Sequence, residues 1–316
     1  MGEKSKKIGE IGENIVENFL KLIGWNAVLS GQELKCRKHL KHARKESKTQ
    51  HRETHGIDFL YCYKSPLESS TIENIIISVK HTKDPYGNTP KTIFKKHVED
   101  LVFTLECYKN SELKKFQLES FGRAKKTKDT GLLFWLSSSE EAYDDVIAKV
   151  SNLRQDQDWI FESFHVVDNK RISFVYDVLG FLKGNFPDKN INFYYPETAL
   201  SYVDDTIPRS GLICPVEFLT SPVIPFMLKP KKSDLQDIFC LASIDPFDYD
   251  GIRRLLKAAK EYTQEVSCQY LFIFPNYVSS NHSGIIRQAF SELENDFISR
   301  VKVMSYHPDF RSLSNE

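Results

Sequence analysis

Apolar residues recur every three or four positions near the start of the chain and predict an amphipathic helix over residues 8–23. Its apolar side is formed by Ile8, Ile15, Phe19 and Leu22. Gly24 follows directly, and a glycine at this place commonly ends a helix. Residues 25–30 are then predicted to form a short strand.

Two runs rich in aromatic and β-branched residues come next, at 56–63 and 74–80. Each run has the length and composition of a strand, and a turn-like segment separates them. The pair is therefore predicted to form a hairpin. A second helix is predicted over residues 92–109, where apolar residues again gather on one side.

From residue 131 onward, strand-like and helix-like segments alternate, which favours parallel α/β units. An irregular, proline-rich stretch at 196–235 interrupts the alternation, which then resumes. The predicted strands are 131–138, 158–167, 191–196, 237–244, 268–275 and 300–308, and the predicted helices are 140–153, 171–185, 247–262 and 283–296.

The composition is that of a globular protein, because 41% of the 316 residues are apolar and 27% are charged. No apolar run approaches the ~20 residues of a membrane span, so no membrane association is expected. The N-terminus is charged and lacks the core of a signal peptide. The six cysteines are scattered without a CxxC pair, which favours reduced thiols and a cytoplasmic location.

Charge is distributed unevenly along a chain whose net charge is zero. Residues 1–130 contain 25 Lys/Arg and 17 Asp/Glu, a net charge of +8, and the remainder carries −8. The densest basic segment, 33–55, predicts contact with nucleic-acid phosphates, although a solvated insertion loop remains an alternative. The candidate phosphate-binding residues are Lys35, Arg37, Lys38, Lys41, Arg44, Lys45, Lys48 and Arg52.

Lys80 stands at the end of a strand that reads as buried, where a lysine requires a negative partner or an exit to water. Three fragments suggest the partner: GEIGENIVENFLKLIGWNAV, HGIDFLY and IIISVK. Together they resemble the PD-(D/E)XK nuclease superfamily, with its restriction-endonuclease-like fold. The matching positions are Gly9 and Glu13 of a GxxxE pattern, Gly24 and Trp25 at the helix end, Asp58 on the second strand and Lys80 on the third.

The resemblance implies an α/β fold whose restriction-endonuclease-like core is a mixed sheet flanked by helices. We expect this nuclease-like domain over residues 1–165, with a basic insertion at 33–55, and an accessory α/β region of unknown role over 166–316. It further implies a Mg²⁺ or Mn²⁺ ion bound by Asp58, Glu13 and the carbonyl of Val79. Lys80 would orient the attacking water and stabilise the transition state, with Asp58, Glu13 and Lys80 as catalytic residues.

Ser78 departs from the family pattern, which places Glu, Asp or Gln two residues before the lysine. A branch of the restriction enzymes also has Ser–x–Lys and supplies the missing carboxylate from the helix after the third strand. Glu99 on the predicted second helix is therefore a candidate fourth metal ligand. An exposed helix carboxylate is the alternative reading of this residue.

Four residues of the basic segment have zinc-finger-like spacing: Cys36, His39, His51 and His55. The segment lacks the second cysteine and the regular apolar pattern of such a finger, so the sequence does not favour zinc there. His55 and His81 flank the predicted metal site and are candidate phosphate contacts.

The leading hypothesis is a metal-dependent endonuclease that hydrolyses DNA, expected to be double-stranded, in bacterial restriction or antiphage defence. A partner subunit or a homodimer stays open. The alternatives are a nuclease fold that has lost catalysis and only binds nucleic acid or a partner, and an unrelated α/β protein. The absence of a Walker A sequence means that any nucleotide-driven step would require another subunit.

Overall fold

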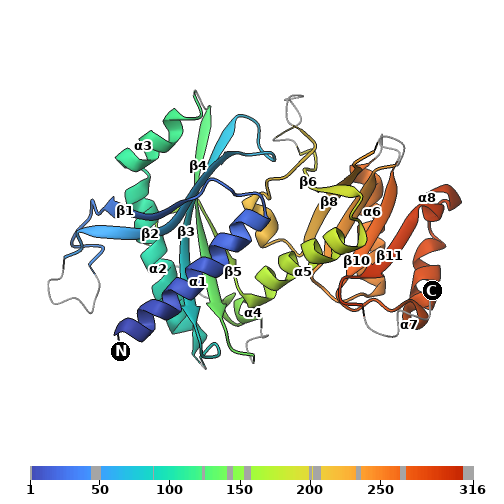
Figure 1. Ribbon diagram of the computed structural model, residues 1–316, viewed down its shortest axis with the longest axis horizontal. Helices are drawn as coiled ribbons and strands as arrows, with labels where there is room; N and C mark the ends of the chain where they lie inside the picture. The colour runs from blue at the N-terminus through green and yellow to red at the C-terminus, as the bar shows by residue number, and fades with distance from the viewer. Residues whose placement is uncertain are drawn as a thin grey trace. The chain divides into compact units, whose positions relative to one another are not determined.

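The computed structural model describes the whole chain except residues 1, 44–50, 88, 123–124, 141–144, 153–157, 199–200, 202–207, 233–235, 264–267 and 309–316. The chain divides into two compact units, Met1–Ile172 and Ser173–Glu316. Each unit contains one sheet (Figure 1). Among the described residues, no helix combines the length and apolarity needed to cross a bilayer.

The sheet of the first unit has five strands in the order β1-β2-β3-β4-β5. The first three strands pair antiparallel, whereas β3, β4 and β5 pair parallel. Their bounds are β1 Leu29–Lys35, β2 Thr54–Lys64, β3 Thr71–Thr82, β4 Lys126–Ser137 and β5 Ser163–Val167. The first five helices, in the order in which they occur along the chain, are α1 Gly2–Leu22, α2 Pro90–Tyr108, α3 Glu112–Glu119, α4 Val146–Val150 and α5 Asn169–Asn185.

Helices α1 and α2 cover opposite faces of this sheet (Figure 1). Phe19 of α1 packs edge-on against Phe134, whereas Phe94 of α2 stacks on Trp135. Since successive side chains of a strand point to opposite faces, adjacent residues of β4 receive the two helices. The mixed α/β sheet flanked by helices agrees with the fold expected from the sequence, and the β2–β3 hairpin is confirmed.

The end of α1 explains why the sequence needs glycine and tryptophan there. Gly24 has a φ of 87°, a left-handed conformation that side chains other than glycine rarely adopt. The next amide, that of Trp25, donates to the carbonyl of Leu20 and closes the helix end. The indole is fully buried and stacks on Tyr61 of β2. This junction fixes α1 against the sheet.

The sheet of the second unit has six strands in the order β11-β10-β9-β8-β6-β7. Strands β9, β10 and β11 are parallel, and the remaining neighbours are antiparallel. Its elements are β6 Lys189–Tyr194, β7 Ser210–Gly211, the 3-10 helix η1 Val216–Leu219, β8 Val223–Pro230, β9 Ile238–Ser243, α6 Tyr249–Tyr262, β10 Gln269–Phe274, α7 Ser279–Phe290, α8 Asn295–Ser299 and β11 Val301–Ser305.

Two sequence expectations are wrong in the second sheet. The strand predicted at 191–196 does not continue a parallel series, because β6 pairs antiparallel with β8. The stretch expected to be irregular contains β8, whose prolines weakened the strand signal. Pro225 lies opposite Leu241 in the pairing with β9, whereas the pairing of β8 with β6 begins only at Phe226.

Two further differences lie in the first unit. The strand predicted at 25–30 is shifted to β1, Leu29–Lys35, because Trp25 belongs to the helix end described above. The segment after the second helix contains α3, which the sequence reading missed. Its start is capped by the side chain of Ser111, which accepts a hydrogen bond from the amide of Lys114 at 3.1 Å.

Candidate active site

Asp58 and Lys80 both lie where β2 and β3 separate. The pairing of these strands reaches Phe59 and Ile77, and one residue further the Asp58 carboxylate accepts a hydrogen bond of 2.6 Å from the Val79 amide. Asp58 and Lys80 are both half-buried. The buried strand therefore ends at an aspartate and a lysine that are still accessible to solvent.

Glu13 approaches the same place from α1. Burial raises its pKa, and the negative charges of Asp58 and Glu10 raise it further, whereas Lys80 lowers it. Glu13 therefore lies within electrostatic range of the other two predicted catalytic residues. Glu10 and Glu13 lie on the same exposed stripe of α1.

Gly12 lets α1 approach this end of β3 closely. A Cβ atom added to Gly12 would lie 2.4 Å from the Cβ of His81, whereas one added to Gly9 would meet nothing within 4 Å. His81 also fixes the helix, because its Nδ1 contacts the Ile8 carbonyl at 2.8 Å and its Nε2 contacts Ser138 Oγ at 2.7 Å. Both ring nitrogens therefore have protein partners, so His81 positions α1 rather than standing free for a phosphate.

We expect Gly12→Ala to displace α1 and to lower the free energy of unfolding by about 1–3 kcal/mol, as overpacking does. Because Glu13 is the next residue, activity should fall by about tenfold or more through misplacement of its carboxylate. Thermal unfolding and cleavage assays measure the two effects. Gly9→Ala is the matched control and should be neutral or slightly stabilising, since alanine favours a helix. Equal behaviour of the two variants would contradict the close-approach role of Gly12.

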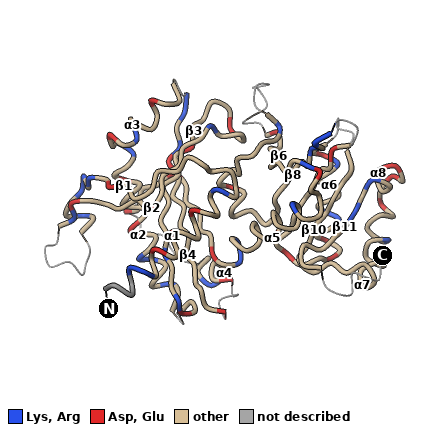
Figure 2. Tube along the Cα trace, viewed as in Figure 1, with Lys and Arg blue, Asp and Glu red and all other residues tan. Residues whose placement is uncertain are grey.

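A cavity of about 780 Å³ opens beside Lys80. Besides this lysine, its lining contains five further Lys/Arg side chains and two carboxylates, so the wall is strongly cationic. The charged lining residues are Lys41, Arg52, Lys80, Lys91, Lys95, Lys96, Glu99 and Asp100, and the histidines are His42 and His97. A concave cationic surface concentrates polyanions, and Figure 2 marks the Lys and Arg positions along the chain.

Three lysines and a histidine of this wall were not among the phosphate-binding residues predicted from the sequence. They come from the first turns of α2, whose residues 91–97 read KTIFKKH. Lys95 follows Lys91 by four residues, and Lys96 comes directly after it. A four-residue spacing places charges on one side of a helix, so this pattern is a sequence signal for the cationic wall. Burial, followed by the charge of Lys80, lowers the pKa of His97 to about 4. At neutral pH this imidazole is therefore uncharged.

Glu99 lines the same cavity as Lys80, which is consistent with the expected position of a carboxylate supplied by α2. Ser78 is half-buried two residues before the lysine and has no carboxylate to offer. In the described part of the chain, Asp58 and Glu13 are not among the residues of the cavity wall. Lys80 thus stands between the Asp58–Glu13 pair and the cationic cavity.

The predicted basic segment is divided by the fold. Lys38 and Lys41 form ion pairs with Glu106, and Lys41 also lines the cavity. Arg52 is 8% exposed, contacts Asp100 at 2.6 Å and lines the cavity too. Arg37 donates to the carbonyl of Asn110, and Lys35 is exposed at the end of β1. Arg44, Lys45 and Lys48 lie outside the described residues.

The structure does not bring together Cys36, His39, His51 and His55, the zinc-finger-like grouping that the sequence did not favour. His39 and His51 are exposed and stack on each other, with ring centroids 4.6 Å apart. Cys36 and His55 are buried and turn instead toward His42 and Cys107. His55 is fully buried and consequently unable to contact a phosphate, contrary to expectation. Sequence spacing selected exposed neighbours because it carries no information on which side chains face inward.

The part of the chain that carries this geometry matches the model of a known protein family. The family described as GAPS4 protein PD-(D/E)XK nuclease domain matches residues 1–171, slightly more than half of the chain. No curated protein matches the chain. The matched residues contain α1, the five-stranded sheet and every residue of the proposed site.

Proposed function

Since the chain belongs to the GAPS4 PD-(D/E)XK nuclease domain family and is thus of nuclease type, we propose that it is a metal-dependent endonuclease that hydrolyses DNA phosphodiester bonds. The observation that carries this proposal is the convergence of Asp58, Glu13 and Lys80 beside a cationic cavity. We assign the chemistry to residues 1–165 and treat 166–316 as an accessory α/β region.

The donor set suits a hard divalent cation such as Mg²⁺ or Mn²⁺. Burial raises the pKa of Glu13, and the negative charge of Asp58 raises it further, so a cation between the two carboxylates would relieve their repulsion. Asp58, Glu13 and the carbonyl oxygen of Val79 would hold the ion. When bound, such an ion supplies a water of lowered pKa and neutralises phosphate charge.

The remaining steps belong to the side chains of this chain. The Asp58 carboxylate is oriented by the Val79 amide, which fixes its position relative to β3. Lys80 places a compact positive charge next to this carboxylate, where it would orient a water and stabilise charge on the phosphate oxygens. The lysines of α2 would hold the flanking phosphates in the cavity.

Double-stranded DNA is the proposed substrate, and restriction or antiphage defence is the proposed setting by family analogy. The experiment uses supercoiled plasmid, linear duplex, single-stranded DNA and RNA, each with Mg²⁺ or Mn²⁺ and each with chelator. Cleavage of the closed circle requires an internal cut, so it distinguishes an endonuclease from an exonuclease. Cleavage of RNA alone, or cleavage that persists in chelator, would contradict the proposal.

Ser78 favours a second candidate, a nuclease fold that retains nucleic-acid binding without catalysis. Serine brings no negative charge to the position where the family pattern has a carboxylate. In that case the protein would bind DNA through the cationic cavity, and none of the four substrates would be cut. A binding assay run beside the cleavage assay separates the two candidates.

Glu99→Gln tests whether α2 supplies the missing carboxylate. If it does, we expect a loss of about 10²-fold in cleavage rate, nearly that of Asp58→Asn. Ser78→Glu should then partly restore the Glu99→Gln variant by returning a carboxylate to β3. Glu112→Gln is the control, because this exposed residue of α3 pairs only locally with Lys115 in the described structure. Full activity of Glu99→Gln would leave Glu13 and Asp58 as the carboxylates and remove Glu99 from the site.

A further inference from the structure

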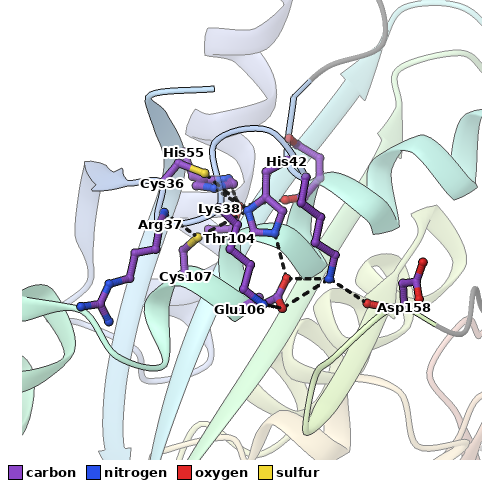
Figure 3. Close-up of polar contacts among 11 residues, drawn as sticks. Cys36, Arg37, Lys38, His42, His55, Thr104, Glu106, Cys107 and Asp158 are labelled. Atoms are coloured by element: carbon purple, nitrogen blue, oxygen red, sulfur yellow. Dashed lines mark hydrogen bonds and ion pairs between the residues drawn. The ribbon is translucent and has the colours of Figure 1, made fainter. Parts of the chain in front are cut away.

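Four buried side chains from separate parts of the fold point at one another (Figure 3), and one of them, His42, also lines the cationic cavity. Cys36 follows β1, His42 lies in the next turn, His55 is on β2 and Cys107 is in the last turn of α2. Each is at most 2% exposed, and their ligand atoms all lie within 4.8 Å of one another. We propose that these four residues form a structural zinc site. The proposal does not rest on the nuclease activity.

The three distances from His42 Nδ1 match edges of a tetrahedron around zinc. His42 Nδ1 lies 3.5 Å from Cys36 Sγ, 3.4 Å from Cys107 Sγ and 3.3 Å from His55 Nε2. Zn–S bonds of about 2.3 Å and Zn–N bonds of about 2.0–2.1 Å at tetrahedral angles place sulfur and nitrogen ligands about 3.5 Å apart and two nitrogens about 3.3 Å apart. The set of two thiolates and two imidazoles is one that zinc prefers.

Hydrogen bonding alone does not account for the convergence. An imidazole nitrogen has either one proton or one lone pair, so His42 Nδ1 makes one good hydrogen bond, yet three partner atoms lie within 3.5 Å. A cation at the centre would satisfy all four ligand atoms together. The two thiols would release their protons on binding, as thiolate ligation requires.

The atoms around the four side chains are arranged as an outer shell of a metal site. His42 Nε2, the nitrogen away from the cluster, contacts Glu106 Oε2 at 2.8 Å, and His55 Nδ1 contacts Thr104 Oγ1 at 3.4 Å. These contacts direct the other nitrogen of each ring inward. The Arg37 amide donates to Cys107 Sγ at 3.3 Å, a contact that stabilises a thiolate. Glu106 in turn pairs with Lys38 and Lys41.

The site would fasten the segment after β1 to α2. Lys41, His42 and Ala43 form one part of the wall of the cationic cavity. The lysines at the start of α2 form another part of this wall. Cys107 anchors the other end of that helix. Zinc would thus fix the positions of the two chain segments that line the cavity, without contacting the substrate.

The first test uses the wild-type full-length chain, so no variant has to fold. Purified without chelator, it should contain about one zinc per chain by elemental analysis. Protein produced in cobalt medium should show the intense visible bands of tetrahedral Co²⁺ and a thiolate-to-cobalt charge-transfer band. Absence of bound zinc together with a failure to take up Co²⁺ in this geometry would overturn the proposal.

The second test separates this cluster from the grouping that sequence spacing suggests. Cys107→Ser and His42→Gln should each lower zinc content at least tenfold, whereas the double variant His39→Gln/His51→Gln should keep it. The reverse result would move the metal to the exposed histidines and overturn the assignment. Asp58→Asn should abolish cleavage yet retain zinc, so failure of the nuclease proposal and failure of the zinc proposal are distinguishable.

Discussion

Asp58→Asn and Lys80→Gln are each expected to lower the rate of DNA cleavage by about 10²-fold or more, with the fold preserved. The two residues lie at the point where β2 and β3 separate, and in the proposed mechanism both act on charge that develops in the transition state. Asparagine keeps the shape of the carboxylate while removing its charge. Glutamine keeps much of the lysine stem. The measurement is the single-turnover rate at saturating enzyme.

The two variants should differ in metal binding, which assigns their roles. Asp58→Asn removes a charged ligand and should weaken Mn²⁺ binding, whereas Lys80→Gln removes a like charge and should leave it unchanged or tighter. Glu17→Gln and Lys83→Gln are the matched controls. Glu17 lies one turn beyond Glu13 and pairs with Lys21 at 2.6 Å, and Lys83 is exposed beyond the end of β3. Wild-type rates in both test variants would refute the site.

Replacing Lys91, Lys95 and Lys96 together by glutamine is expected to weaken DNA binding by about 10²-fold or more at 0.1 M salt. These lysines line the cavity beside Lys80 and come from the first turns of α2. Each lost phosphate contact should reduce the slope of log K against log salt by about 0.9, so the slope should fall by roughly 2–3. Fluorescence anisotropy over a salt series measures both quantities.

A control with the same change in charge distinguishes local contact from a general electrostatic effect. Lys64, Lys115 and Lys126 lie on β2, α3 and β4, and the two strand residues are at the sheet end away from Lys80. Their triple glutamine variant should bind DNA with nearly wild-type affinity and slope. If both triple variants lost affinity equally, the cavity would not be the binding surface. The paired residue Lys38 should show a smaller effect, because Glu106 already neutralises it.

Local sequence determined the elements whose signals are contained within a few turns or one strand pair. The 3.6-residue repeat predicted α1, and Gly24 marked its end because residues other than glycine rarely adopt the left-handed conformation found there. The two apolar runs and the turn between them predicted the β2–β3 hairpin. The resemblance to the nuclease superfamily implied that Asp58 and Lys80 share a site, and the hairpin places both residues at the same end of the strand pair.

Tertiary structure decided what depends on partners far along the chain. The sequence named Gly9 from its motif, but packing against His81 requires Gly12. It assigned phosphate binding to the basic segment, whereas the fold pairs Lys38 with Glu106, buries Arg52 and adds lysines of α2 to the cavity wall. Charge is readable from sequence, but whether a charge faces substrate or a neighbouring carboxylate depends on three-dimensional contacts.

The same limit explains the sheets and the cysteine–histidine cluster. Alternation of strands and helices identified an α/β chain, yet only hydrogen bonding between distant strands placed β6 beside β8 in a separate sheet. Spacing relates Cys36 to His39, whereas the fold buries Cys36 beside Cys107 of α2, 71 residues later in the chain. Local periodicity reflects backbone geometry, while convergence of side chains reflects the packing of elements that the sequence separates.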